Sequence, residues 1–129
     1  MSVQLNHTIV WCRDQQKSAN FYTEILGLPT PVRFGPFLVV ELSNGVSLDF
    51  YQQEEGYPQH YAFLVEEEEF DPIFARIQGR GLKYWADPTR TRPGEINRND
   101  GGRGVYFRDP DDHLLEIITR PYGSAGNAD

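Results

Sequence analysis

Residues 106–117 read Tyr-Phe-Arg-Asp-Pro-Asp-Asp-His-Leu-Leu-Glu-Ile, which predicts a strand, a tight turn and a second strand. The proline among three aspartates is typical of a turn, and the flanking apolar residues predict strands at residues 104–108 and 114–119. Glu116 stands inside the second strand, which is apolar on both faces. Burying an unpaired carboxylate costs several kcal/mol. Glu116 must therefore be protonated, be paired with a cation or line a polar cavity.

The first half of the chain shows the same mixture of short strands and one helix. Alternation of apolar and polar residues predicts a strand at residues 3–11. Asp14 is placed to cap a helix over residues 15–26, and Gly27 is placed to end it. Turn dipeptides, among them Asn44-Gly45, then separate three predicted strands. These strands cover residues 30–34, 37–42 and 46–51.

After a polar linker at residues 52–59, the order of elements repeats. A strand is predicted at residues 60–65 and a helix at residues 70–80, with the acidic run 66–69 at its N-terminal end, where carboxylates are favourable. Further strands follow at residues 83–85, 104–108 and 114–119. The chain therefore reads βαβββ twice, an internal repeat of the α+β class, and the tail at residues 123–129 is expected to be disordered.

Composition restricts the kind of protein. The chain has 129 residues, a formal net charge of −7 and one cysteine. The length fits one domain, and the negative charge disfavours a nucleic-acid binder. A lone Cys12 forms no internal disulfide, so we expect it to be a small buried hydrophobic residue. With no signal peptide and no apolar run long enough for a membrane span, the expected location is cytoplasmic.

Two histidines and two carboxylates occupy matching places in the repeat. His7 and His60 lie on the first strand of their modules, and Asp49 and Glu116 lie on the last. An insertion before the third strand of the second module, at residues 86–102, accounts for the longer His-to-carboxylate spacing there. Each residue alone has a plain structural interpretation, as a hydrogen-bonded strand histidine or a turn aspartate. Together they predict a site for Zn, Ni, Mn or Fe(II), which take N and O ligands.

The insertion is locally basic despite the acidic chain. It offers two interpretations: a lid that meets an anionic substrate through bidentate arginines, or a solvated loop whose arginines pair with nearby acids. Arg90 and Arg92 are the candidate substrate-binding residues. The insertion contains Arg90, Arg92 and Arg98, and Arg103 follows directly after it.

These motifs resemble the vicinal oxygen chelate superfamily. The resemblance is carried by residues 7–10, by Asp14 with residues 17–28, and by residues 106–117. The superfamily includes glyoxalase I, extradiol dioxygenases, fosfomycin-resistance transferases and the metal-free bleomycin-resistance proteins. The likeness implies a single domain at residues 1–122, whose two βαβββ modules, residues 3–53 and 60–120, form a cupped mixed sheet with the helices outside.

The resemblance also implies a site. Its metal positions fall on His7, His60 and Glu116, with Asp49 at the fourth, and a metal-bound carboxylate, Glu116 or Asp49, acts as catalytic base. Trp11 stands where glyoxalase I has an arginine that meets glutathione, which suggests a flat or apolar substrate instead. We expect His113, at the turn, to point to solvent.

Three functions are compatible with the sequence. The leading one is a small metal-dependent enzyme of the glyoxalase type, with lyase or isomerase chemistry on an oxygen-bearing small molecule. The first alternative is an extradiol-type ring-cleaving dioxygenase that uses Fe(II). The second is a non-enzymatic protein that binds a drug or metabolite. In each case the resemblance implies a homodimer, and the aromatic residues of the chain could supply its interface.

Overall fold

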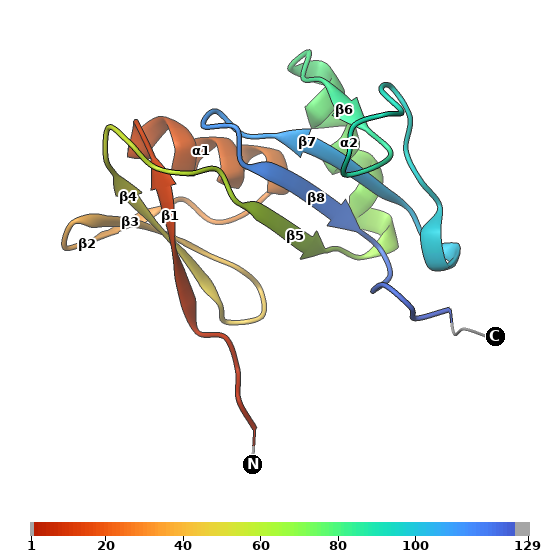
Figure 1. Cartoon of the computed structure of the whole chain (residues 1–129). Coiled ribbons are helices and arrows are strands. Elements are labelled where there is room, and N and C mark those ends of the chain that lie inside the picture. The colour runs from red at the N-terminus through yellow and green to blue at the C-terminus, as the bar shows by residue number, and fades with distance from the viewer. Residues whose placement is uncertain (1, 126–129) are drawn as a thin grey trace. The chain divides into compact units, whose positions relative to one another are not determined.

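The computed structural model describes residues 2–125, and the chain divides into two compact units, Met1–Pro58 and Gln59–Asp129. Each unit contains one four-stranded sheet and one α-helix (Figure 1). The candidate site residues of each unit are positioned by the register of its own sheet.

The first unit is a βαβββ module. Its sheet has the order β1-β4-β3-β2, in which β1 and β4 are parallel and the other pairs are antiparallel. The Asp14 side chain caps α1 by accepting from the Lys17 backbone N–H at 3.1 Å, and Gly27 ends the helix with φ 72°. The elements are β1 (His7–Cys12), α1 (Gln15–Leu26), β2 (Val32–Phe34), β3 (Phe37–Glu41) and β4 (Ser47–Gln52).

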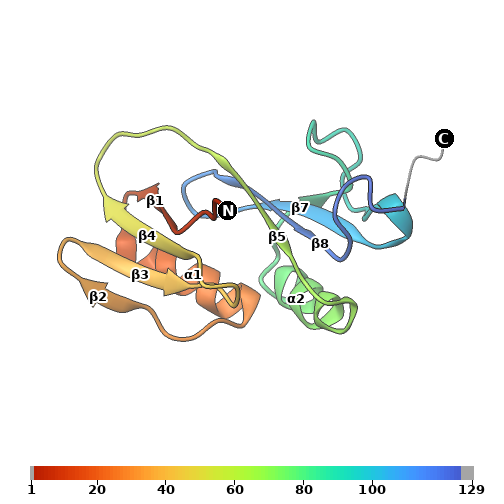
Figure 2. The same cartoon turned by 90° about the horizontal axis from the view of Figure 1, so that it is seen from below.

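The second unit repeats this topology. Its sheet has the order β5-β8-β7-β6, and β5 and β8 are its parallel pair (Figure 2). The βαβββ repeat predicted from the sequence is therefore confirmed. The elements are β5 (His60–Leu64), α2 (Glu67–Gly79), β6 (Tyr84–Trp85), the short 3-10 helix η1 (Asn99–Gly101), β7 (Gly104–Arg108) and β8 (Leu114–Ile118).

Each helix covers one face of its sheet. In the first unit the ring of Tyr22 on α1 meets Phe50 on β4 edge-on, with ring centroids 4.9 Å apart. In the second unit the apolar stripe of α2 is buried, and Phe74 meets Tyr84 on β6 at 5.0 Å. Because side chains alternate along a strand, the opposite face of each sheet carries the candidate site residues.

The helix α2 begins three residues before the predicted start. Glu69 lies one turn after Glu66, and its Oε1 accepts from the Glu66 backbone N–H at 3.0 Å. This capping box satisfies a backbone donor that the helix leaves without an intrahelical partner. The acidic run at residues 66–69 is therefore the first turn of the helix and its cap, as its charge predicted.

His113 does not point to solvent, and the expectation that it would is wrong. Its side chain is fully buried, and its Nδ1 accepts from the Gln59 backbone N–H at 2.7 Å. Asp112 takes the left-handed turn conformation, with φ 66°. Because Asp112 makes the turn, His113 is the residue just before β8 and its side chain faces the interior. There it accepts from the backbone N–H of Gln59, the residue before β5.

Two further expectations concern Cys12 and the C-terminal tail. Cys12 is buried, as predicted. The tail was expected to be disordered from residue 123, but the backbone N–H groups of Gly123 and Ala125 donate to the Asp100 carboxylate at 3.1 and 3.4 Å. The remaining tail residues, 126–129, lie outside the described part of the chain. Across residues 2–125, no helix has the length and apolar character that a membrane crossing requires.

Candidate metal centre

His60 is the first residue of β5, and a backbone contact fixes its ring. Its Nδ1 lies 2.8 Å from the carbonyl oxygen of Leu114 on the neighbouring strand β8. A carbonyl oxygen only accepts hydrogen bonds, so Nδ1 carries the proton and donates it. In the neutral ring Nε2 then has a free lone pair, which is the form of histidine that binds metals.

Glu116 is the third residue of β8, and its side chain has no solvent exposure. Its Oε1 lies 3.1 Å from Nε2 of His60, and its Oε2 accepts from the hydroxyl of Tyr122. A carboxylate oxygen and an imidazole lone pair are both acceptors. Their contact therefore requires a cation between them, either a proton or a metal ion.

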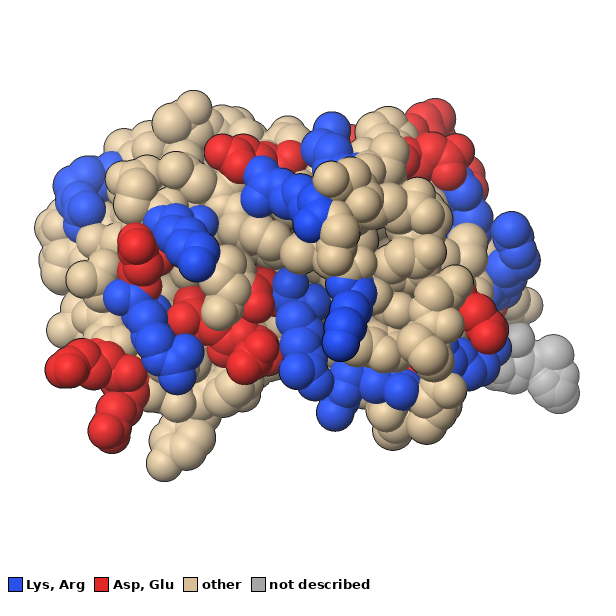
Figure 3. Space-filling model, turned by 90° about the horizontal axis from the view of Figure 1, so that it is seen from above, with Lys and Arg blue, Asp and Glu red and all other residues tan. Residues whose placement is uncertain are grey.

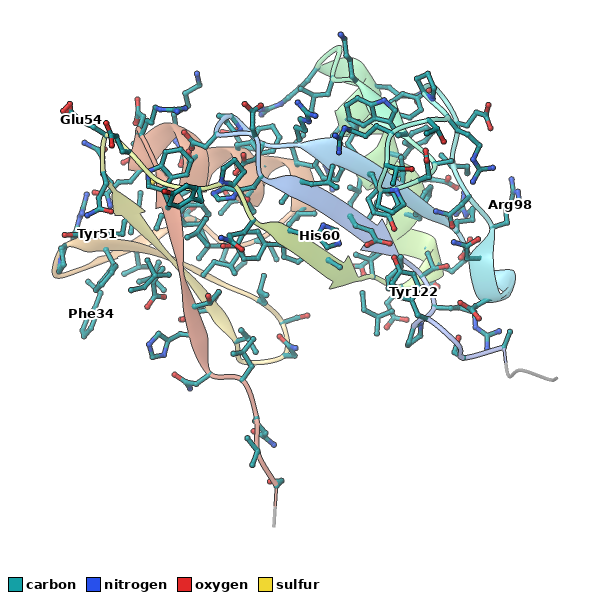
Figure 4. The ribbon with its side chains drawn as sticks, in the orientation of Figure 1. Phe34, Tyr51, Glu54, His60, Arg98 and Tyr122 are labelled. Carbon is teal, nitrogen blue, oxygen red and sulfur yellow. The ribbon has the colours of Figure 1, made fainter. Side chains whose placement is uncertain are left out.

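Two tyrosines form a hydrogen-bonded chain that ends on Oε2 of Glu116. Burial of the hydroxyls, together with the nearby Glu116 carboxylate, raises the pKa of both Tyr106 and Tyr122, so both keep their protons at neutral pH. The two hydroxyls lie 2.7 Å apart. Because Tyr122 donates to Glu116, the second proton runs from Tyr106 to Tyr122. Figure 4 shows Tyr122 on the segment after β8 and His60 on β5.

The donor pair fits a divalent metal ion. Two ligands that each lie about 2.1 Å from one ion, at a right angle, are separated by roughly 3 Å. The distance of 3.1 Å between Nε2 and Oε1 is compatible with that separation, as it is with a hydrogen bond from a protonated imidazole. One nitrogen and one oxygen donor suit Zn, Mn or Fe(II). A metal ion would also supply the positive charge that a fully buried carboxylate needs.

The first unit presents the equivalent pair in the same register. His7 pairs with Ser47, and Asp49 stands two residues further along β4. His60 pairs with Leu114, and Glu116 stands two residues further along β8. The equivalence inferred from sequence spacing is thus confirmed as a matching strand register.

His7 and Asp49 have separate partners within their unit. His7 Nδ1 lies 2.8 Å from Asn6 Oδ1, and Asp49 accepts from the Ser47 hydroxyl at 2.9 Å. Within neither unit do the described residues bring three or more His, Cys, Asp or Glu side chains together. The convergence of all four predicted ligands stays a prediction.

Trp11, a predicted substrate-binding residue, lies on the same face of β1 as His7. Its indole N–H donates to the Gln53 carbonyl at 3.1 Å, and the Arg13 guanidinium lies 4.9 Å from the ring centroid. Gly56 lies so close to the indole that a Cβ there would collide with the ring. The ring is therefore held in place by its own unit.

The predicted substrate residues Arg90 and Arg92 lie in a loop organised by Asp87. The Asp87 carboxylate accepts from the backbone N–H groups of Thr91 and Arg92, and the Thr91 hydrogen bonds are the main reason that its pKa lies well below the ordinary value. Both arginines are exposed; Arg90 donates to the Pro88 carbonyl, and Arg92 lies 4.0 Å from Glu95. Their role in substrate binding stays a prediction.

The sequence interpretation missed both tyrosines of the site. Tyr106 could have been identified from the sequence, because the hairpin around residues 109–112 pairs Tyr106 with Glu116 on one face of the sheet. Tyr122 could not have been, since it follows β8 in irregular chain where no periodic pattern fixes the direction of a side chain.

Known proteins share this fold. Residues 4–117 match the model of the Glyoxalase/Bleomycin resistance protein/Dioxygenase superfamily. The chain is 34% identical to a protein named glutathione transferase FosA from Serratia marcescens, over 91% of this chain and 81% of that one.

Among solved structures, the chain is similar to two proteins named oxidases. Oxidase ChaP-H2 is 61% identical with a TM-score of 0.94, covering 98% of this chain and 100% of that one. Oxidase ChaP-H1 is 62% identical with a TM-score of 0.92, covering 95% of this chain and 99% of that one. The α+β fold with two βαβββ modules is thus the vicinal oxygen chelate fold, and the chain belongs to the glyoxalase, bleomycin resistance protein and dioxygenase superfamily.

Proposed function

We propose that this chain is a metal-dependent enzyme that oxidises a small aromatic molecule. The metal dependence is supported by one observation, the contact of 3.1 Å that places His60 Nε2 and the buried Glu116 Oε1 as a nitrogen and an oxygen donor to one cation. The oxidative chemistry is supported by the identity of 61% and 62% to proteins named oxidases over nearly the whole chain.

The proposed metal ligands are His60, Glu116 and His7, with Asp49 available as a fourth. Two histidines and one carboxylate form the ligand set of non-haem Fe(II) oxygenases, which leaves coordination positions open for substrate and oxidant. Asp has one methylene fewer than Glu and its carboxylate is engaged by Ser47. We therefore place Asp49 outside the essential set.

A bound divalent metal would supply Lewis acidity for an oxygen-bearing substrate and, as Fe(II), electrons for dioxygen. The protein residues do the positioning. The Leu114 carbonyl holds the His60 tautomer, and the Tyr122 hydroxyl occupies Oε2 of Glu116, so that Oε1 is the oxygen directed at the metal position. The Tyr106 ring stacks on His60 at 6.0 Å and limits rotation of the imidazole.

We favour oxidation over the lyase or isomerase chemistry that we expected from the sequence. The extradiol-type alternative is itself oxidative and uses the same three ligands. The half-buried Trp11 ring, on the face that carries His7, adds an aromatic wall to that side of β1, beside Arg13 and Gly56. In a non-enzymatic binding protein the His60–Glu116 contact would be a structural ion pair only.

A second candidate is a thiol transferase that acts on fosfomycin. It is favoured by the identity of 34% to glutathione transferase FosA. Trp11 weighs against glutathione as co-substrate, because the arginine that meets glutathione in glyoxalase I is absent at that position.

Metal titration tests the metal dependence. Protein stripped with chelator and titrated with Mn²⁺ by calorimetry should bind about one ion per chain. His60→Ala and Glu116→Gln should each abolish measurable binding, whereas Glu95→Gln, a matched change at an exposed carboxylate, should not. Affinity should also fall as pH decreases from neutral, because protons compete for the imidazole nitrogen. No binding by the wild-type chain to Mn²⁺, Zn²⁺ or Fe²⁺ would refute the proposal.

Oxygen uptake distinguishes the two candidate activities. The Fe²⁺-loaded protein is assayed in an oxygen electrode with 1-naphthol and 1,5-dihydroxynaphthalene, and in parallel for conjugation of glutathione to fosfomycin. The oxidase proposal expects oxygen uptake that Glu116→Gln removes. Fosfomycin conjugation without oxygen uptake would establish the transferase instead.

A further inference from the structure

A pocket lies in the second unit, on the same sheet as the candidate metal centre. Its cavity volume is about 470 Å³, within the usual size of small-molecule sites. Two cationic side chains and one indole, Lys83, Arg108 and Trp85, line it together with Leu82 and Asp109. None of these residues was among those predicted from the sequence to bind substrate.

The pocket opens on the face of the sheet that carries Glu116. Tyr84 points toward α2, so Trp85, the next residue, points to the opposite face. Trp85 pairs with Tyr106, and Tyr106 pairs with Glu116, so the three residues form one row across β6, β7 and β8. Two strand spacings put Trp85 about 10 Å from Glu116 along that row.

The charges of the pocket favour an anion. The Asp109 carboxylate is buried and accepts from the backbone N–H groups of Asp111 and His113 at 2.8 and 2.9 Å. The ion pair of Arg108 with the exposed Asp112 is long, at 4.0 Å, and contributes little. Figure 3 shows that Lys and Arg side chains gather in places on the surface although the net charge is −7.

The indole adds a preference for a flat ring. The Arg108 guanidinium lies 5.6 Å from the Trp85 ring centroid, so charge and ring face are presented side by side. A carboxylate or phenolate takes charge-assisted hydrogen bonds from Arg108 and Lys83, while the aromatic body that carries it packs on Trp85.

We infer that this pocket binds the anionic end of a flat aromatic molecule, whose other end extends along the row of residues toward His60 and Glu116. The location beside the metal centre rests on the proposed function, but binding to the pocket does not. The substrate class is therefore an extended aromatic compound with a carboxylate or phenolate oxygen. The cationic pair supplies the charge recognition that Arg90 and Arg92 were predicted to supply.

The experiment uses metal-free protein and 2-naphthoate as the probe. Calorimetry should show binding of 2-naphthoate and at least tenfold weaker binding of both the neutral 2-naphthalenemethanol and the ring-free anion acetate. Arg108→Gln and Lys83→Gln should each weaken 2-naphthoate binding about tenfold, the effect of one lost charge-assisted hydrogen bond. Arg98→Gln removes an exposed arginine outside the pocket and should leave binding unchanged.

Location is tested with a single indole reporter. In ¹⁵N-labelled Trp11→Phe protein, Trp85 is the only tryptophan, and its N–H resonance should shift as 2-naphthoate is added. Equal binding of the neutral analogue or of acetate, an unmoved Trp85 signal at saturation, or full affinity in both pocket variants would overturn the inference. Because the protein is metal-free, failure here leaves the metal proposal standing, and failure of metal binding leaves this result intact.

Discussion

The two oxygens of Glu116 lie in different surroundings. Oε2 is occupied by the Tyr122 hydroxyl, whereas Oε1 faces Nε2 of His60 at 3.1 Å. Tyr122 is placed by its own short segment, in which the next residue, Gly123, donates to Asp100. Partners of this kind orient metal ligands, and removing one commonly weakens metal binding 10- to 100-fold.

The variant Tyr122→Phe should therefore weaken Mn²⁺ binding about tenfold or more. The ring remains, but Glu116 loses the hydrogen bond that directs Oε1 at the metal position. Calorimetric titration measures the effect, and Tyr57→Phe, which alters a tyrosine that is 82% exposed, is the matched control. Unchanged affinity in Tyr122→Phe would show that Tyr122 does not position Glu116.

His113 has a structural role that the wild-type fold depends on. Replacing it with Ala leaves a cavity and removes the acceptor of the Gln59 backbone N–H. The free energy of unfolding should fall by about 2–4 kcal/mol in urea titrations of metal-free protein. His7→Ala, at an exposed histidine, should change it by less than about 0.5 kcal/mol. Similar losses in the two variants would contradict the assignment of His113 to the interior.

At the scale of elements, Arg103, the residue before β7, ties the start of that strand to the helix α2. Its Nε donates to Glu67 at 2.6 Å and its Nη1 to Asp71 at 2.7 Å, and the guanidinium lies 4.4 Å from the Phe70 ring centroid. Its place in the sequence suggested that this arginine belongs with those of the loop before it. The structure instead assigns it to the packing of the helix against its sheet.

The variant Arg103→Ala should lower the free energy of unfolding by about 1–2 kcal/mol. Each partly exposed ion pair contributes up to about 1 kcal/mol, and the contact with the ring adds a similar amount. Part of the loss should disappear in 1 M NaCl, where the wild-type ion pairs are screened. Urea unfolding measures the effect against Arg98→Ala, whose side chain projects from the loop before η1 (Figure 4). Equal stability of the two variants would contradict this role.

Most elements could be predicted because their signals are local. The cap of Asp14 and the stop at Gly27 gave α1 its observed bounds, Gln15–Leu26. The start of β1 could not be predicted, since the alternating pattern continues through Val3 and Leu5, which have no strand partner and are 95% and 68% exposed. The pocket around Trp85 was missed for a related reason: strand register across the sheet, not spacing along the chain, places Lys83 and Arg108 together.

At the scale of the whole molecule, two copies of one module carry the proposed ligands at matching positions but with different surroundings. The Glu in the second module reaches its histidine, whereas the shorter Asp49 in the first module is bonded to Ser47. The sequence could identify all four positions through the repeat. It could not establish which pair makes contact, because that depends on side-chain length and on Tyr122.

We further propose that the protein is a homodimer. Apolar residues of the first unit are exposed on its sheet, among them Ile9, Val32 and Phe34, and exposed apolar patches commonly mark interfaces. Light scattering at micromolar concentration should give twice the chain mass. Substituting Phe34 with Glu should shift the mass toward that of one chain, and a wild-type protein that scatters as a monomer would contradict the proposal.

Anomalous diffraction from a crystal grown with Mn²⁺ tests the metal centre most directly. A single strong peak should lie within bonding distance of His60 Nε2 and Glu116 Oε1, with His7 as the third protein ligand and Tyr122 on the opposite oxygen of Glu116. A peak bound to other residues, or none at a Mn²⁺ concentration that saturates binding in solution, would contradict the assignment of His60 and Glu116 as metal ligands.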